Sequence, residues 1–183
     1  MNYKLLPEPQ KIRSKFIDTF VLTYSEFVSL NGKNISELHT GFNEKHYSKM
    51  FMWDKIIKSA REISFADALT LLKNKTGEVL FLTEFYNTDP VGHEFSILNA
   101  HNEFAAVSSP QELAECISYE WFTMYELYEH ESYRDDWIIP QDLYVFDESF
   151  SWCLIFTHET DFETESADSR FCLYIDRTKL SKE

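Results

Sequence analysis

Apolar residues in the first third of the chain recur at helical spacing. From residue 11 to residue 30 they fall three or four positions apart, which places them on one face of a helix. The residues on this face are Ile12, Phe16, Phe20, Thr23, Phe27 and Leu30. The pattern predicts a single helix over residues 11–30, ended by the turn-forming pair Asn31-Gly32.

Two more helices are predicted before residue 76. One covers residues 43–60, and its inward-facing side chains are Tyr47, Met50, Phe51 and Ile57. The other begins at Ser64, where the sequence S-F-A-D has the form of a capping box, and it ends between Asn74 and Gly77.

The pattern changes after Gly77. Residues 79–85, with the sequence VLFLTEF, form a short apolar run that predicts a strand, and residues 94–107 predict one or two more. The sequence S-P-Q-E at residues 109–112 predicts the start of a long helix, because it supplies a capping serine, a first-position proline and an early glutamate. This helix extends to residue 131, and its buried stripe is Leu113, Ile117, Trp121, Met124 and Tyr128.

After Pro140 the spacing becomes that of strands. The sequences LYVFD, SWCLIFTHE and RFCLYID predict three strands. In the middle strand both faces are apolar, with Trp152, Leu154 and Phe156 on one side and Cys153 and Ile155 on the other. Such a strand is central and covered on both sides.

Helices followed by a mostly antiparallel sheet, with one long helix packed on it, define the fold class as α+β. The chain has 183 residues and 44% hydrophobic residues, which is enough to bury a substantial core. We therefore expect residues 1–183 to form a single α+β domain.

Charge divides the chain into two unequal parts. The net charge is −14, yet residues 1–75 carry +4 and residues 76–183 carry −18. From Thr76 to Ser169 the only basic side chain is Arg134. Such an acidic surface repels nucleic acid and anionic membranes, so we expect neither as a partner.

Targeting signals and cysteines point to a reducing compartment. The first residues lack the apolar core of a signal peptide, and the sequence has no membrane-spanning run of apolar residues. The three cysteines, Cys116, Cys153 and Cys172, lie in apolar contexts typical of reduced core thiols. We expect a cytoplasmic protein.

The acidic stretch from Phe156 to Arg170 is the strongest candidate for a metal site. His158 and Glu159 are suitable ligands, but a calcium loop needs a glycine to turn the backbone, and this stretch has none. Phe162 stands where the zinc motif H-E-x-x-H needs its second histidine. We expect a solvated loop between two strands, with no metal and no cofactor.

Three catalytic hypotheses have weak support in the sequence. Asp147 and Glu159 are candidates for a general acid/base pair, since both lie near strand ends among aromatic residues. Cys153 and Cys172 lie among large apolar residues, which favours packing over nucleophilic catalysis. Glycine-rich phosphate loops are absent. We expect no enzyme; a metal-assisted hydrolase around His158 and Glu159 is the alternative.

Aromatic and acidic residues alternate between Trp121 and Trp137. Tyrosine and tryptophan among carboxylates occur on solvated helix faces and also at interfaces, where they act as rigid apolar anchors. The interface hypothesis, combined with the acidic stretch after residue 158, assigns partner binding to Glu126, Glu129, Tyr133, Asp135, Asp136, Glu159, Asp161, Glu163 and Glu165.

The sequences SPQELAECISYEWF (residues 109–122) and PQDLYVFDESFSWCLIFTHET (residues 140–160) resemble small acidic immunity proteins of bacterial contact-dependent and polymorphic toxin systems. The similarity extends over residues 109–176. It implies a cytosolic inhibitor that binds one cognate toxin, often a basic nuclease, and blocks its active site or substrate surface. It carries over no binding residue and leaves the toxin's identity and activity open. A general adaptor that binds another protein through the same acidic and aromatic side chains is a further alternative.

Overall fold

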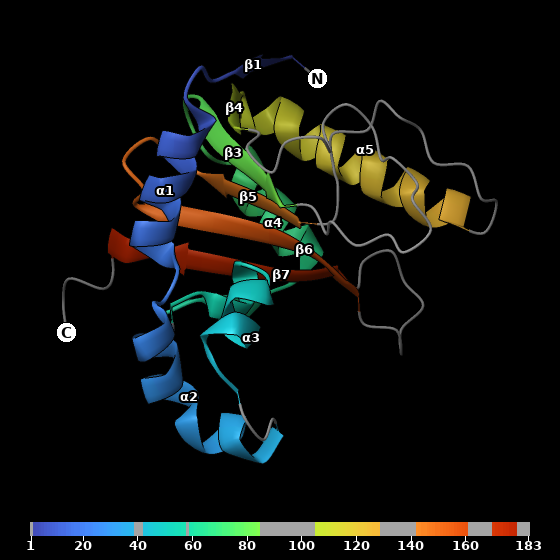
Figure 1. Ribbon diagram of the computed structural model, residues 1–183. Coiled ribbons are helices and arrows are strands. Elements are labelled where there is room, and N and C mark those ends of the chain that lie inside the picture. The colour runs from blue at the N-terminus through green and yellow to red at the C-terminus, as the bar shows by residue number, and fades with distance from the viewer. Residues whose placement is uncertain are drawn as a thin grey trace, which may run out of the picture.

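The computed structural model describes residues 2–38, 42–57, 59–84, 105–128, 142–160 and 170–178. A seven-stranded, fully antiparallel sheet lies at its centre, with the strand order β1-β4-β3-β5-β6-β7-β2 (Figure 1). The strands are β1 (Tyr3–Leu5), β2 (Arg61–Ile63), β3 (Val79–Glu84), β4 (Ala105–Ser108), β5 (Asp142–Phe146), β6 (Trp152–Thr160) and β7 (Arg170–Asp176).

Helices cover both faces of this sheet. The α1 face is covered by α1 (Pro9–Phe20) and the short η1 (Trp53–Lys55), while the α4–α5 face is covered by α4 (Phe65–Lys73) and α5 (Pro110–Tyr128). Two further helices, α2 (Tyr24–Leu38) and α3 (Glu44–Lys49), extend beyond the sheet. The α+β class predicted from the sequence is confirmed, with helices on two faces rather than one long helix on one.

The central strand β6 matches the predicted alternation. Trp152, Leu154 and Phe156 are buried in the core on the α4–α5 face. Cys153 and Ile155 are fully buried in the core on the α1 face. Two separate cores on either side of one sheet require a strand that is apolar on both faces.

The single helix predicted over residues 11–30 is wrong, because the chain leaves helical geometry at Val21 and bridges to Ile56. The next helix starts with a capping box, T-Y-S-E. The Glu26 carboxylate accepts hydrogen bonds from the Thr23 N–H (2.8 Å) and hydroxyl (2.7 Å), and the Glu26 N–H donates to the hydroxyl (3.3 Å). Apolar spacing continues across the break and conceals it.

The predicted stop at Asn31-Gly32 is also wrong, since α2 continues through Gly32 to Leu38. The helix predicted over residues 43–60 is much shorter. Asn43 caps α3 by accepting from two backbone N–H groups, and the chain becomes extended at Met50. After Met50, burial of Met52 and Ile56 against the sheet replaces helix propagation.

The later elements agree with the sequence more closely. The four strands β3, β5, β6 and β7 and the start of α5 lie within one residue of the expected positions, and the Ser109 hydroxyl caps α5 by accepting from the Glu112 N–H (3.2 Å). β4 overlaps the last three residues of the range 94–107, where one or two strands were expected, and ends one residue beyond it. β1 and β2 were not predicted, because three residues are too few to show a period.

Hydrogen bonds connect the start of α5 to the end of α4. The Gln111 side chain, in the first turn of α5, donates hydrogen bonds to the carbonyls of Lys73 (2.8 Å) and Lys75 (3.2 Å). These carbonyls lie at the end of α4 and just beyond it, where the helix no longer supplies backbone N–H donors. Among the described residues, no helix has the length and apolar character needed to cross a membrane.

Candidate functional site

The two ends of the sheet are built differently. At one end, β3 finishes opposite the start of β5 (Glu84 with Asp142), and β6 finishes opposite the start of β7 (Thr160 with Arg170). β4 also starts here, at Ala105 opposite Leu82. We call this the open end, because residues 85–104, 129–141 and 161–169, which lie outside the described part of the chain, are all attached to it.

The opposite, closed end is formed by tight connections. The Asp147 carboxylate, in the β5–β6 turn, accepts hydrogen bonds from the N–H groups of Ser151 (2.7 Å) and Trp152 (3.2 Å) and from the hydroxyls of Ser149 and Ser151. Burial opposes ionisation here, but these bonds outweigh it and lower the pKa of Asp147. Asp147 therefore holds a turn.

The hypothesis that Asp147 and Glu159 form a general acid/base pair is wrong. Glu159 lies eight positions beyond Ser151 along β6, toward the open end. A strand rises by roughly 3.3 Å per residue, so about 26 Å separates the two carboxylates. No single substrate bond lies within reach of both.

Two charged side chains are buried at the open end. Asp142 is 0% exposed and Arg170 is 2% exposed. The Arg170 guanidinium donates to the carbonyls of Thr157 and Phe156 (3.3 Å) and lies 5.8 Å from the centre of the Phe156 ring. The β6–β7 register shifts between Phe156 and Thr160, so this guanidinium serves carbonyls beside the irregularity.

Burial dominates the electrostatics of Arg170. It lowers the pKa to about 10, while Cys172 and Asp142 act in the opposite direction. A pKa near 10 keeps the side chain cationic at neutral pH. Arg170 therefore stabilises the ends of β6 and β7 from within the core, and its burial keeps the guanidinium from contacting a ligand.

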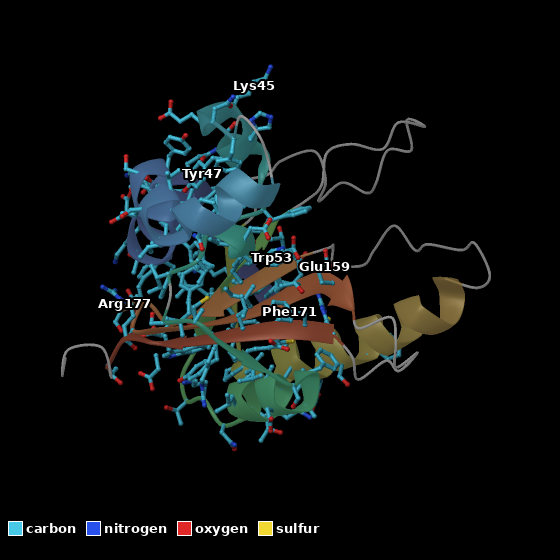
Figure 2. All side chains as sticks on the ribbon, turned by 90° about the horizontal axis from the view of Figure 1, so that it is seen from below. Lys45, Tyr47, Trp53, Glu159, Phe171 and Arg177 are labelled. Carbon is cyan, nitrogen blue, oxygen red and sulfur yellow. The ribbon has the colours of Figure 1, made fainter. Side chains whose placement is uncertain are left out.

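Acidic and aromatic side chains gather on the α1 face of the open end. The ring of Trp53 in η1 lies 5.9 Å from that of Phe171 in β7, and the backbone N–H of Trp53 donates to the Tyr144 hydroxyl (3.2 Å). The exposed Glu159 of β6 lies beside these two rings (Figure 2). Together with Asp54, these residues form what we call the acidic–aromatic surface: Trp53, Asp54, Glu159 and Phe171.

The carboxylates of this region act on one another. Burial raises the pKa of Asp54; a hydrogen bond from the Phe51 N–H and the charge of Lys55 oppose this, whereas Asp142 and Glu159 add to it. Asp54 is exposed, so water screens these effects. The contributions of Asp142 and Glu159 show that these carboxylates lie near Asp54, and neighbouring carboxylates favour an incoming cation.

Several cations of the described part lie over aromatic rings. The shortest contacts are Lys75 to the Trp152 ring (4.0 Å) and Lys15 to the Phe150 ring (4.3 Å). An ion pair joins Lys11 to Glu8. Aromatic rings engage these cations without cancelling carboxylate charge, so the negative field of the protein persists.

The predicted partner-binding residues fall on both sides of the described boundary. Glu159 lies in the acidic–aromatic surface, and Glu126 lies in the last turns of α5, where the structure describes the backbone alone. The others, Glu129, Tyr133, Asp135, Asp136, Asp161, Glu163 and Glu165, lie outside the described residues.

Three residues of the acidic–aromatic surface were missed from the sequence. Trp53 and Asp54 come from the more basic half of the chain, inside the range expected to be helical. Phe171 is one of the large apolar residues around Cys172, to which the sequence pattern assigned packing and no partner contact. Only the crossing of η1 over β7 brings them to Glu159.

The metal and thiol hypotheses find little support among the described residues. No three histidine, cysteine or acidic side chains meet there in a way that would hold an ion, and the His158 side chain is outside the described set. None of the three cysteines forms a disulfide, and burial raises the pKa of Cys172 to about 12 and that of Cys153 well above its usual range. Neither buried thiol readily forms the reactive thiolate.

Three comparisons with known proteins gave no match: no family model, no curated protein and no solved structure is similar to this chain at a significant level.

Proposed function

We propose that this protein is a non-enzymatic inhibitor of the immunity type, which binds a basic toxin, a nuclease in the first instance, through the open end of its sheet. The observation that carries the proposal is the acidic–aromatic surface, where Glu159 lies beside the rings of Trp53 and Phe171 (Figure 2) and Asp54 follows Trp53 in η1, near enough for Glu159 to act on its pKa. Aromatic anchors among surface carboxylates suit a cationic protein partner.

The connectivity at the open end supports the same proposal. Residues 85–104, 129–141 and 161–169 carry eleven acidic side chains and one basic side chain, Arg134. The two segments that hold most of the predicted binding residues are attached to neighbouring strands, one before Asp142 of β5 and one after Thr160 of β6. Both acidic segments are therefore attached to neighbouring strands at the open end of the sheet.

Binding to a nuclease gives this charge a specific use. A nuclease needs a basic surface to hold phosphates, and carboxylates placed against that surface compete with the nucleic acid. Long-range attraction raises association rates toward ~10⁸ M⁻¹s⁻¹ at low salt. Charge alone does not give tight binding, so the buried parts of Trp53 and Phe171 supply the desolvated contact.

The test compares charge reversal at the two ends of the sheet. The variant Asp54→Lys/Glu159→Lys changes the open end, and Glu78→Lys/Glu148→Lys makes the same change in net charge with exposed residues at the closed end. Proteins captured at low salt from the native lysate are identified, purified and titrated against wild type and both variants. Their toxicity and nuclease activity are then measured with and without the inhibitor.

We expect one basic toxin, with binding that weakens at high salt and falls at least about 100-fold in the open-end variant. Equal losses in the two variants would show that net charge acts without a defined surface. A captured protein with no toxic activity would support the adaptor alternative. Stoichiometric metal in the purified protein, together with hydrolytic activity, would support the hydrolase around His158 and Glu159.

A further inference from the structure

Three neighbouring aromatic rings are partly exposed on the α1 face. The ring of Phe51 lies nearly parallel to that of Trp53, with the ring centres 6.2 Å apart and the planes at 14°. The Trp53 ring in turn lies 5.9 Å from that of Phe171, with the planes at 56°. All three residues are half-buried, so part of this aromatic area is in contact with solvent. Adjacent aromatic side chains at a surface are typical of a binding site.

The core of the protein holds these rings in place. The backbone N–H of Trp53 donates to the Tyr144 hydroxyl (3.2 Å), and Met52 and Ile56 on either side of η1 are buried against the sheet. Phe171 belongs to β7, which is paired on both sides, with β6 and with β2. A ring that is fixed before binding loses little conformational entropy when a ligand contacts it.

Carboxylates from two elements lie next to the rings. Glu159 in β6 is exposed and lies beside Trp53 and Phe171 (Figure 2). Asp54 follows Trp53 in η1, and its carboxylate accepts a hydrogen bond from the Phe51 N–H. An ionised carboxylate has about four positions at which it accepts hydrogen bonds, so Asp54 retains acceptor capacity for a ligand.

Two cations lie near these carboxylates, and both are buried. Lys55, which is 9% exposed, acts on Asp54 and lies over the Tyr47 ring at 5.0 Å. Arg170, which is 2% exposed, is paired with the residue that follows Glu159 and donates to backbone carbonyls. The charge that this region exposes beside the rings is therefore negative, and charge complementarity selects a cationic occupant.

The combination of rings and carboxylates favours arginine over lysine. A guanidinium is planar and weakly hydrated, so it stacks on an aromatic face while its N–H groups point outward in its own plane. An ammonium is compact and strongly hydrated, so contact with a ring removes more of its hydration. Arginine also forms two parallel hydrogen bonds with one carboxylate, which a single ammonium cannot reproduce.

The protein makes the same kind of contact between its own residues. The Arg61 guanidinium lies 5.1 Å from the centre of the Tyr174 ring, which is 7% exposed. Burial of the ring reduces competition from water and strengthens its attraction for a cation. Trp53 and Phe171 are half-buried, so an arginine placed against them is partly desolvated in the same way.

We propose that the acidic–aromatic surface binds one arginine side chain of the basic partner. The guanidinium stacks on the Trp53 ring, its aliphatic stem packs on Phe171, and its N–H groups donate to Glu159 and Asp54. This inference rests on the proposed function and deepens it, since it names the chemical group of the partner that the open end recognises. A nuclease that binds phosphates through arginine carries such side chains on the surface that an inhibitor has to cover.

The first experiment titrates the isotope-labelled full chain with the peptides GRG and GKG, blocked at both ends, at low salt. The indole N–H signal of Trp53 is assigned with the variant Trp53→Phe. We expect this signal to shift saturably with GRG, at a dissociation constant below about 20 mM. GKG carries the same charge and should bind at least about threefold more weakly. Equal affinities for the two peptides, or no shift at Trp53, would overturn the proposal.

Two matched pairs of variants locate the binding site, with the amide signal of Phe171 as the readout. Trp53→Leu keeps an apolar side chain without a ring and should weaken GRG binding at least about threefold, whereas Trp53→Phe keeps a ring and should bind within about twofold of wild type.

The second pair changes one carboxylate at each end of the sheet. Glu159→Gln removes a charge beside the rings and should weaken GRG binding at least about threefold, whereas Glu148→Gln, exposed at the closed end, should bind as wild type does. Equal losses in these two variants would show that net charge alone attracts the peptide and would contradict the proposal. This pair decides the question if Trp53→Leu lowers the unfolding temperature.

The captured toxin separates this inference from the proposed function. Its surface arginines are replaced one at a time by lysine, which preserves charge. One replacement should weaken binding to wild type at least about tenfold and binding to Trp53→Leu less than about twofold. If every replacement changes affinity less than about twofold while Asp54→Lys/Glu159→Lys still weakens binding about 100-fold, the arginine site is wrong and the open-end proposal stands. Preference for GRG without any basic toxin in the lysate would support the arginine site and contradict the proposed function.

Discussion

The closed end of the sheet and the open end use charge for different purposes. At the closed end the Asp147 carboxylate accepts four hydrogen bonds within a turn, so its charge stabilises local structure. At the open end Arg170 is buried at the ends of β6 and β7, while Glu159 and Asp54 are exposed and Glu159 lies beside the rings of Trp53 and Phe171. The buried charge there stabilises the strand ends, and the exposed charges contribute to the field that a partner meets.

This difference shows why the acidic residues of one protein are not interchangeable. A carboxylate that accepts several hydrogen bonds is held in place and partly neutralised by them. A carboxylate in solvent near other carboxylates contributes to the long-range field. Position relative to the two ends of the sheet, more than net charge, therefore decides which acids act on a partner.

The largest expected effect tests the buried charge at the open end. Arg170→Met leaves the carbonyls of Phe156 and Thr157 without this donor and removes a cation that interacts with the buried Asp142, so we expect a loss of about 3–5 kcal/mol in the free energy of unfolding. Arg177→Met is the matched control at the closed end, where the exposed guanidinium donates one bond to Phe150 (3.2 Å). Urea denaturation should show less than about 1 kcal/mol for the control. Similar losses of unfolding free energy in both variants would contradict the distinction between buried charge at the open end and exposed charge at the closed end.

The next effect tests the surface of the open end. Trp53→Ala removes the ring packed at 5.9 Å from Phe171, and we expect partner affinity to fall by about 2 kcal/mol, or roughly 30-fold. The matched control is Trp152→Ala at the closed end, which should lower stability while leaving the affinity of the folded fraction unchanged. Calorimetric titration gives the affinity and circular dichroism gives the stability. Unchanged affinity in Trp53→Ala would exclude an anchoring role.

The smallest effect tests the closed end and depends on pH. Because the folded protein lowers the pKa of Asp147, its stabilising contribution is present above the unfolded pKa, near 3.9, and is lost as the pH falls through the folded value. Asp147→Asn should cost about 1–2 kcal/mol at pH 7. The gap between wild type and variant should narrow below about pH 4.

Thermal unfolding at several pH values checks this prediction. Glu148→Gln, an exposed neighbour in the same turn, is the control and should be nearly neutral throughout. A gap between wild type and Asp147→Asn that stays constant down to pH 3 would show that the hydrogen bonds at Asp147 do not depend on its charge.

Prediction from sequence succeeded where local chemistry and periodicity agreed. Ser109 and Pro110 marked the start of α5, and the apolar alternation of β6 indicated two covered faces. Prediction failed at the break after Phe20, because Phe27 continues the apolar spacing although it belongs to a different helix. The signal that was available there is the capping box of Thr23 and Glu26.

The candidate site was predicted only in part. Glu159 was identified as a binding residue because acids cluster around it in the sequence. Trp53 and Asp54 carry no such mark, and they lie more than a hundred positions away from Glu159 along the chain. Their place beside Glu159 depends on the packing of η1 against β7, which is a long-range contact.

By itself the sequence determined the α+β class, the two-sided burial of β6 and the division of charge between the two parts of the chain. These properties follow from local period, capping residues and composition, which need no knowledge of neighbours in space. The tertiary structure alone decided the strand order, the two short edge strands and the open end. The reason is physical: strand pairing and helix docking join residues far apart in the chain, and their free energy comes from surfaces that exist only after both have met.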